Sequence, residues 1–136
     1  MSRRTARELV LQSLYQVDFS KADPETALQA SMEERDVQED ATTANYARTV
    51  LMGTVANMAA IDEKISQYAK NWELSRMPII DRNILRMAVY EMLFAEEKQP
   101  VNIAVNEAVE IAKLYGTEKS SGFINGVLGQ MMRNGK

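Results

Sequence analysis

The sequence of 136 residues contains no cysteine and no histidine. The lack of cysteine excludes disulfides, thiol catalysis and thiolate-bound zinc, and the lack of histidine removes the commonest general base near neutral pH. Carboxylates remain, but neighbouring acidic pairs such as Asp62 and Glu63 point to different sides of a helix, which favours a solvated surface over an acid/base pair. We therefore predict that the protein is not an enzyme and that it holds no metal and no cofactor.

Long hydrophobic runs are also missing. No apolar stretch approaches the roughly 20 residues that cross a bilayer. The basic residues near the start, Arg3, Arg4 and Arg7, are not followed by the apolar stretch and cleavage site of a signal peptide. A composition of 46% hydrophobic and 26% charged residues is that of an ordinary folded domain. These features predict a single domain that stays in the cytoplasm.

The net charge of −3 at pH 7 argues against an indiscriminate polyanion binder, since such proteins usually carry a large positive excess. The charges are unevenly distributed along the chain. The first seven residues hold three arginines and no acid, whereas residues 33–40 hold five acids and one arginine. Positive potential is therefore expected only locally.

Apolar residues recur at three- and four-residue spacing along most of the chain, which is typical of amphipathic helices. Helices are predicted at about residues 5–19, 24–34, 43–58, 61–72, 78–93, 102–114 and 120–132, the second with Asp23 as N-cap before Pro24 and the sixth with Asn102 as cap. The sequence leaves open whether the third and fourth form one bent helix. No stretch alternates as a strand would. The predicted fold is all-α, with about seven helices and lobes of about residues 1–58 and 59–136.

Three arginines and a tyrosine share one side of the first predicted helix. At about 100° per residue, Arg3, Arg4, Arg7 and Tyr15 fall within an arc of roughly 120°. Arginine binds phosphate in a fork and tyrosine can stack on an unpaired base, a combination that suits single-stranded RNA. The alternative is that the arginines only add solubilising charge and that Tyr15 belongs to the core.

The segment 116–126 is rich in glycine and serine and leads into the last predicted helix. A phosphate could bind at that helix start beside Lys119. Alternatively, Ser120 only caps the helix. For Gly122 and Gly126 we favour a role in close packing of two helices. Phe123 is either a core anchor or a second stacking ring.

A mixed-charge strip marks the fifth predicted helix. Asp81, Arg86 and Tyr90 recur at five- and four-residue spacing, and Arg82 lies four residues before Arg86. Tyrosine and arginine are over-represented in protein interfaces, so the strip could bind a protein partner. The same side chains could equally pair inside the fold, and the sequence leaves both alternatives open.

Four blocks of the sequence resemble the NusB family of transcription antitermination factors. They are residues 3–15 (RRTARELVLQSLY), 84–93 (ILRMAVYEML), 105–116 (VNEAVEIAKLYG) and 123–128 (FINGVL). The resemblance spans nearly the whole chain, although the acidic loop and residues 70–77 match poorly. It implies an all-helical protein of two packed bundles, without catalytic activity.

The resemblance also implies ligands and site residues. Members of the family bind the boxA element of ribosomal RNA leader transcripts together with the ribosomal protein NusE, within an RNA polymerase complex that resists termination. The implied RNA-binding residues are Arg3, Arg4, Arg7, Tyr15, Lys119, Ser121, Phe123 and Asn125. The implied NusE-binding residues are Asp81, Arg86 and Tyr90. Because relatives often have an acid at position 119, Lys119 should raise the attraction for RNA there.

Few phosphate contacts and a net negative charge predict weak, salt-sensitive RNA binding that tightens when NusE adds a second RNA surface. Two other classes remain open. NusB-like domains also occur ahead of RNA methyltransferase domains, although no such domain follows within these 136 residues. The chain could also be a non-catalytic helical interaction module or a homodimer, in which the three arginines do not bind RNA.

Overall fold

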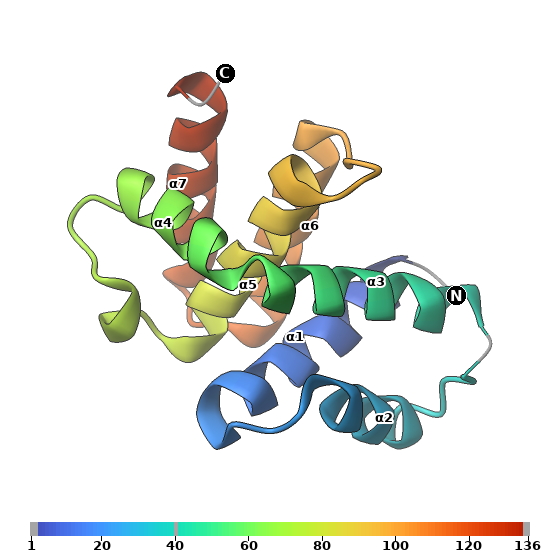
Figure 1. Ribbon diagram of the computed structural model, residues 1–136. Helices are drawn as coiled ribbons and strands as arrows, with labels where there is room; N and C mark the ends of the chain where they lie inside the picture. Colours follow the sequence, from blue (N-terminus) through green and yellow to red (C-terminus); the bar gives the residue numbers. More distant parts are fainter. Residues whose placement is uncertain (1–2, 40, 135–136) are drawn as a thin grey trace.

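Seven α-helices and two short helical turns make up the computed structural model, which describes residues 3–39 and 41–134 (Figure 1). The helices are α1 (Arg3–Ser20), α2 (Pro24–Glu34), α3 (Thr42–Ala56), α4 (Met58–Tyr68), α5 (Ile79–Val89), α6 (Val101–Tyr115) and α7 (Ser120–Asn134). The turns are η1 (Leu74–Arg76), before α5, and η2 (Tyr90–Phe94), which continues α5. The described part of the chain contains no strand, so the predicted all-α fold class is confirmed.

The helix boundaries follow from local residue chemistry. At α2, the Asp23 carboxylate accepts the backbone N–H of Thr26 at 3.1 Å and Pro24 occupies the first turn, as predicted. The cap predicted for the sixth helix is wrong, because the N-cap position of α6 is Pro100, two residues before Asn102, and Asn102 lies inside the helix. The fixed φ of proline suits a helix start, so Pro100 sets the boundary instead of an asparagine cap.

α3 and α4 are separate helices that meet at Asn57 (Figure 1). The backbone N–H of Asn57 donates to the carbonyl of Gly53 at 3.1 Å, and its side-chain amide donates to the same carbonyl at 2.8 Å. Asparagine readily hydrogen-bonds nearby backbone in this way, which favours a helix end over a continuous helix. The question that the sequence left open is thereby answered.

α1 lies at the centre of the packing, against α2, α3 and α5, while α6 packs on α7 and α5. Buried side chains from both halves of the chain, such as Leu9, Leu14, Ile84 and Ile124, belong to one hydrophobic cluster. The division into lobes of about residues 1–58 and 59–136 stays a prediction. None of the helices in the described ranges is both long enough and apolar enough to span a membrane.

The turn η2 is a single π-helical turn that aims two polar side chains inward. The N–H of Ala95 donates to the carbonyl of Tyr90 at 2.9 Å, five residues back. Tyr90 and Glu91 are both buried. The Tyr90 ring packs on Gly53 of α3, where a Cβ would overlap the ring. The bare glycine therefore lets α3 approach η2 closely.

Candidate nucleic-acid interface

The three arginines of α1 differ in what they contact. Arg3 is exposed, lies 4.1 Å over the ring of Tyr46, and makes no ion pair among the described residues. Arg4 is partly exposed and forms a two-pronged ion pair with Glu107 of α6, with N–O distances of 2.6 and 2.8 Å. Hydrogen bonding from Arg4 lowers the pKa of Glu107, against the opposing effect of burial. Arg3 is therefore free to bind an anion, whereas Arg4 must first leave Glu107.

Arg7 is buried, with 3% of its surface exposed, and its guanidinium is occupied inside the protein. Nε and Nη2 donate to the Glu91 carboxylate at 2.9–3.1 Å, and Nη1 lies 3.5 Å from Glu107. The hydroxyl of Tyr46 donates to Glu91 as well. Burial alone would lower the pKa of Arg7, but the hydrogen bonds and charge of Glu91 raise it above its usual value. Arg7 thus ties α1 to η2, and its burial keeps the guanidinium from an outside ligand.

A cleft of about 500 Å³ opens beside Arg3, between the start of α1, the start of α3 and the segment after η2. Tyr46 and Tyr90 line it from one side, and Glu96 and Glu97 from another. The two carboxylates offset the charge of Arg3, so this end of the molecule is only weakly positive. It therefore suits a weak anion contact rather than a strong one.

Tyr15 lies away from the arginines. It is eleven and twelve residues along α1 from Arg4 and Arg3, a rise of about 17 Å, and eight residues from Arg7. Its ring stacks on Phe19 with centroids 5.6 Å apart. Together with Ile80 and Tyr115 it lines a groove of about 380 Å³. Gln12 also lines this groove, and its buried Oε1 accepts no hydrogen bond in the described structure. The structure thus places Tyr15 in a different site from Arg3 and Arg4.

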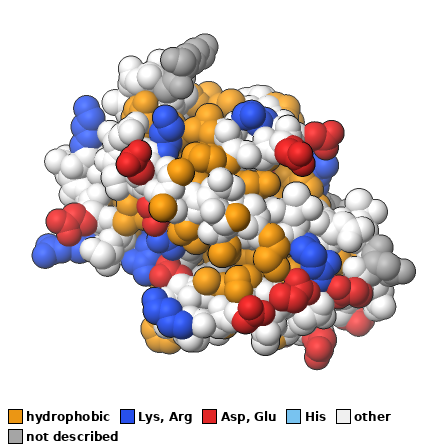
Figure 2. All heavy atoms as spheres, in the orientation of Figure 1, with side chains coloured by type: hydrophobic (Ala, Val, Ile, Leu, Met, Phe, Trp, Pro, Cys, Tyr) orange, Lys and Arg blue, Asp and Glu red, His pale blue; other side chains and the backbone are white. Residues whose placement is uncertain are grey.

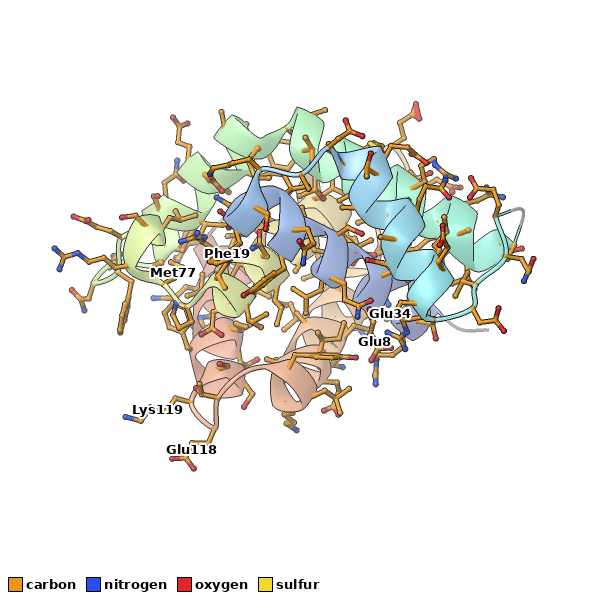
Figure 3. All side chains as sticks on the ribbon, turned by 90° about the horizontal axis from the view of Figure 1, so that it is seen from below. Glu8, Phe19, Glu34, Met77, Glu118 and Lys119 are labelled. Atoms are coloured by element: carbon orange, nitrogen blue, oxygen red, sulfur yellow. The ribbon has the colours of Figure 1, made fainter. Side chains whose placement is uncertain are left out.

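The turn between α6 and α7 and the first two turns of α7 carry the other predicted RNA-binding residues. We call them the loop surface: Lys119, Ser121, Phe123 and Asn125. Lys119 and Asn125 are exposed, and Ser121 and Phe123 are partly buried. Figure 3 shows Glu118 and Lys119 projecting from the body of the protein. Phe123 both packs against the core and meets the ring of Trp72 edge-on at 5.8 Å, so it is at once an anchor and part of an aromatic pair.

The expectation that Gly122 and Gly126 let two helices pack closely is wrong. A Cβ at either position would find no atom within 4 Å, so both face open space. Gly116 is the glycine that a close contact requires, because a Cβ there would overlap the side chain of Ser120. Ser120 does not act as a simple cap, since its hydroxyl accepts the N–H of Thr117 at 2.9 Å and donates to Asp81 at 2.7 Å.

The strip on α5 is used within the fold. Asp81 is 4% exposed, and burial raises the pKa of its carboxyl, against the effect of the Ser120 hydrogen bond. Arg86 binds Asp62 through Nε and Nη2 and Asp18 through Nη1 at 2.8–3.0 Å. Tyr90 is 7% exposed. The intramolecular alternative thus describes these contacts, and a role of the three residues in partner binding stays a prediction.

The sequence does not reveal several side chains that contact the predicted site residues inside the fold. They are Tyr46, Glu91, Glu107, Asp18 and Trp72. The described residues contain no group of three or more acidic side chains placed to hold a metal ion. Acidic side chains gather instead over α2 and the following segment, at the lower right of Figure 2, where Glu33, Glu34, Asp36 and Glu39 are exposed. This acidic surface is unsuited to a nucleic acid.

The fold and these surfaces define a small all-helical protein with basic and aromatic side chains exposed at two places, the class of a non-catalytic nucleic-acid-binding adaptor. The pattern that characterises the NusB family matches residues 4–133. The chain belongs to the NusB family, and the resemblance seen in the sequence is confirmed.

Individual relatives agree with this assignment. The transcription antitermination protein NusB of Heliobacterium modesticaldum is 49% identical over 133 residues, which are 98% of this chain and 63% of that longer protein. The solved structure of T. maritima NusB superposes with a TM-score of 0.87 at 38% identity, over 98% of this chain and 92% of that one. The Heliobacterium relative is named for transcription antitermination and not for a catalytic activity.

A third likeness is to a structure that contains other molecules. A chain in the crystal structure of the antitermination factors NusB and NusE in complex with dsRNA has a TM-score of 0.87 and 27% identity. The match covers 96% of each chain. The fold of this protein is therefore one that has been observed in a complex of those two factors with RNA.

Proposed function

We propose that this protein is a cytoplasmic transcription antitermination factor that binds boxA RNA of ribosomal RNA leader transcripts together with NusE, as part of an RNA polymerase antitermination complex. The observation that carries the proposal is the likeness, over 96% of both chains, to a chain solved in a complex of NusB, NusE and dsRNA. The exposed cations Arg3 and Lys119 support RNA as a ligand, since neither makes an ion pair with another described residue.

RNA is held at two places in this proposal. Arg3 and Arg4 contact it at the start of α1, and the loop surface contacts it at the turn before α7. Arg7 supports the first place from inside by holding α1 against Glu91. Only Arg3 and Lys119 among these cations lack an ion pair in the described structure. Each phosphate contact to a single strand contributes about −0.7 to the slope of log K against log salt concentration. For two to three such contacts we expect a slope of about −1.5 to −2.

The groove of Tyr15, Ile80 and Tyr115 is the surface that we assign to NusE. Its walls combine apolar and aromatic side chains with polar ones such as Gln16 and Thr26, the mixture of a protein-binding groove. Asp81 follows Ile80 directly and is fixed to Ser120 at the start of α7. Asp81, Arg86 and Tyr90, which the family resemblance implies in NusE binding, stay predicted contacts of that partner.

RNA binding tests this proposal. We expect a fluorescently labelled boxA oligonucleotide to bind weakly by anisotropy and to bind more tightly when NusE is added. Removing the two free cations by Arg3→Ala and Lys119→Ala should weaken binding and flatten the salt slope. Arg133→Ala is the matched control, because it removes one exposed charge at the other end of α7.

Two results contradict the proposal. Equal affinity with and without NusE would refute the cooperative part. If Arg3→Ala and Lys119→Ala bind RNA as tightly as Arg133→Ala, the basic residues are not the RNA site, and a purely structural helical module or homodimer fits better.

A further inference from the structure

Trp72 is the one tryptophan of the sequence, and 51% of its surface is exposed. It lies in the connection between α4 and α5, and its backbone N–H donates to the carbonyl of Ala69 at 3.1 Å. Further along, Arg82 donates to the carbonyl of Leu74 at 3.2 Å, and Met77 is buried in the core. The connection is therefore held at several points, and the exposure of Trp72 is a feature of a fixed backbone.

The indole ring has one aromatic neighbour among the described residues, and about half of the surface of Trp72 stays exposed. Its ring and that of Phe123 meet at an interplanar angle of 67°, with centroids 5.8 Å apart. In an edge-to-face contact of this kind at most one face of each ring is covered. An aromatic face open to water beside a second ring is the arrangement on which an unpaired base stacks.

The two segments that carry this aromatic pair also carry exposed cations, along with the exposed acids Glu73 and Glu118. Lys70 and Arg76 flank Trp72 in the same connection, and Lys119 lies four residues before Phe123. Lys70 and Lys119 make no ion pair in the described structure, and Arg76 meets Glu73 only at 3.8 Å with both side chains mostly exposed. Met77, at the end of this connection, and Lys119 lie on the same half of Figure 3, opposite Glu8 and Glu34. A phosphate next to a base stacked on Trp72 would have the exposed Lys70 and Arg76 in the same short connection.

We propose that Trp72 stacks on an unpaired base of the bound RNA strand, so that the loop surface continues through Phe123 onto the connection between α4 and α5. This inference rests on the proposed RNA binding and adds a contact residue to it. The occupant is a single strand rather than a duplex, because the stacking bases of a duplex are already covered by each other.

The fluorescence of the single tryptophan reports on this contact directly. Titration of the intact protein with single-stranded boxA RNA should quench the emission of Trp72 with the same midpoint as anisotropy. Trp72→Ala should weaken binding about 5- to 150-fold, the equivalent of about 1–3 kcal/mol for one base stacked on an aromatic ring. Trp72→Phe keeps a ring and should lose less. Phe19→Ala is the matched control, because Phe19 is 67% exposed but stacks on Tyr15 instead of Phe123.

The outcomes separate this inference from the proposed function. RNA that binds without quenching, and with equal affinity for Trp72→Ala and Phe19→Ala, overturns the role of Trp72 and leaves the RNA-binding function standing. Quenching by NusE alone, with no further change on adding RNA, also overturns it, since a protein then covers the ring. Absence of any RNA binding by the unaltered protein refutes the proposed function itself. If Trp72→Ala fails to fold by circular dichroism, quenching of the unaltered protein and the affinity of Trp72→Phe decide.

Discussion

Replacing Arg7 by alanine should destabilise the fold far more than it weakens RNA contacts. Arg7 and Glu91 are 3% and 2% exposed, and the guanidinium covers both carboxylate oxygens. Its removal leaves a buried carboxylate with only the hydroxyl of Tyr46 as a partner. Breaking a buried ion pair from one side costs about 3–5 kcal/mol, a large part of the roughly 5–15 kcal/mol that stabilises a domain of ordinary size.

The loss can be measured by thermal or urea unfolding followed by circular dichroism. For 136 residues the unfolding entropy is about 0.3 kcal/mol/K, so the expected loss lowers the melting temperature by roughly 10–17 °C. Arg3→Ala is the matched control on the same helix. It removes an exposed cation over the ring of Tyr46, worth about 0.5–1 kcal/mol.

A compensated variant separates the buried charge from the loss of contact area. Arg7→Met with Glu91→Gln removes both charges, keeps an acceptor for Tyr46, and should recover most of the stability that Arg7→Ala loses. The opposite result would be that Arg7→Ala has the same melting temperature as Arg3→Ala and loses only RNA affinity. In that case Arg7 would be a surface ligand of RNA rather than the internal support of α1.

Three further variants test the packing and electrostatics around the two sites. Asp81→Asn should stabilise the protein at neutral pH. The pKa of Asp81 is raised in the folded protein, so the ionised carboxylate lowers the free energy of unfolding above that folded pKa. The gain over the unaltered protein should vanish below pH about 4, where the carboxyl is protonated in both the folded and the unfolded state. A melting series from pH 3 to 8 measures this, and a gain that persists unchanged at pH 3 contradicts it. Gly53→Ala should cost about 1–3 kcal/mol, since the added methyl overlaps the buried ring of Tyr90; an unchanged urea midpoint would show that the ring moves aside freely. Gly126→Ala should instead add about 0.5–1 kcal/mol, because the methyl faces open space in the middle of α7, and a loss of stability would mean that this face is covered.

The helices were predictable from the sequence because their signals are local. Spacing of apolar residues placed all seven, and the Asp23 cap with Pro24 gave the start of α2 to the residue. Boundaries failed where two local signals competed, as at Pro100 and Asn102. The break at Asn57 depended on one side chain turning back on the carbonyl of Gly53, a choice that the apolar pattern does not contain.

The spacing of apolar residues in the sequence places Arg7 on the buried face of α1, but its positive charge favoured the prediction of an exposed RNA-binding residue. Arg7 is three, four and seven residues before Val10, Leu11 and Leu14, so it shares the buried face of α1. Its partner Glu91 likewise follows Met87 and Ala88 on the apolar face of α5. Two opposite charges on two buried faces indicate an internal ion pair, but Arg7 and Glu91 are 84 positions apart and no local pattern joins them.

The loop surface was only partly predictable for a related reason. Lys119 and Phe123 stand out in the glycine-rich segment 116–126, whereas Trp72 lies in a connection without periodicity, and only the tertiary fold brings it to Phe123. The spacing of Gly122 and Gly126 suits close packing of helices, but the sequence does not say which side of α7 the rest of the protein covers. Contacts between elements distant in the chain are the part that local chemistry does not determine.

Crosslinking of boxA RNA to the complex of this protein with NusE, with the attachment sites mapped by mass spectrometry, tests the central claim most directly. The account predicts attachment at the loop surface, in peptides containing Lys119 and Phe123, and at the start of α1 near Arg3. Attachment only at the acidic surface around Glu33, Glu34 and Asp36, with the loop surface and the start of α1 unmodified, would contradict it.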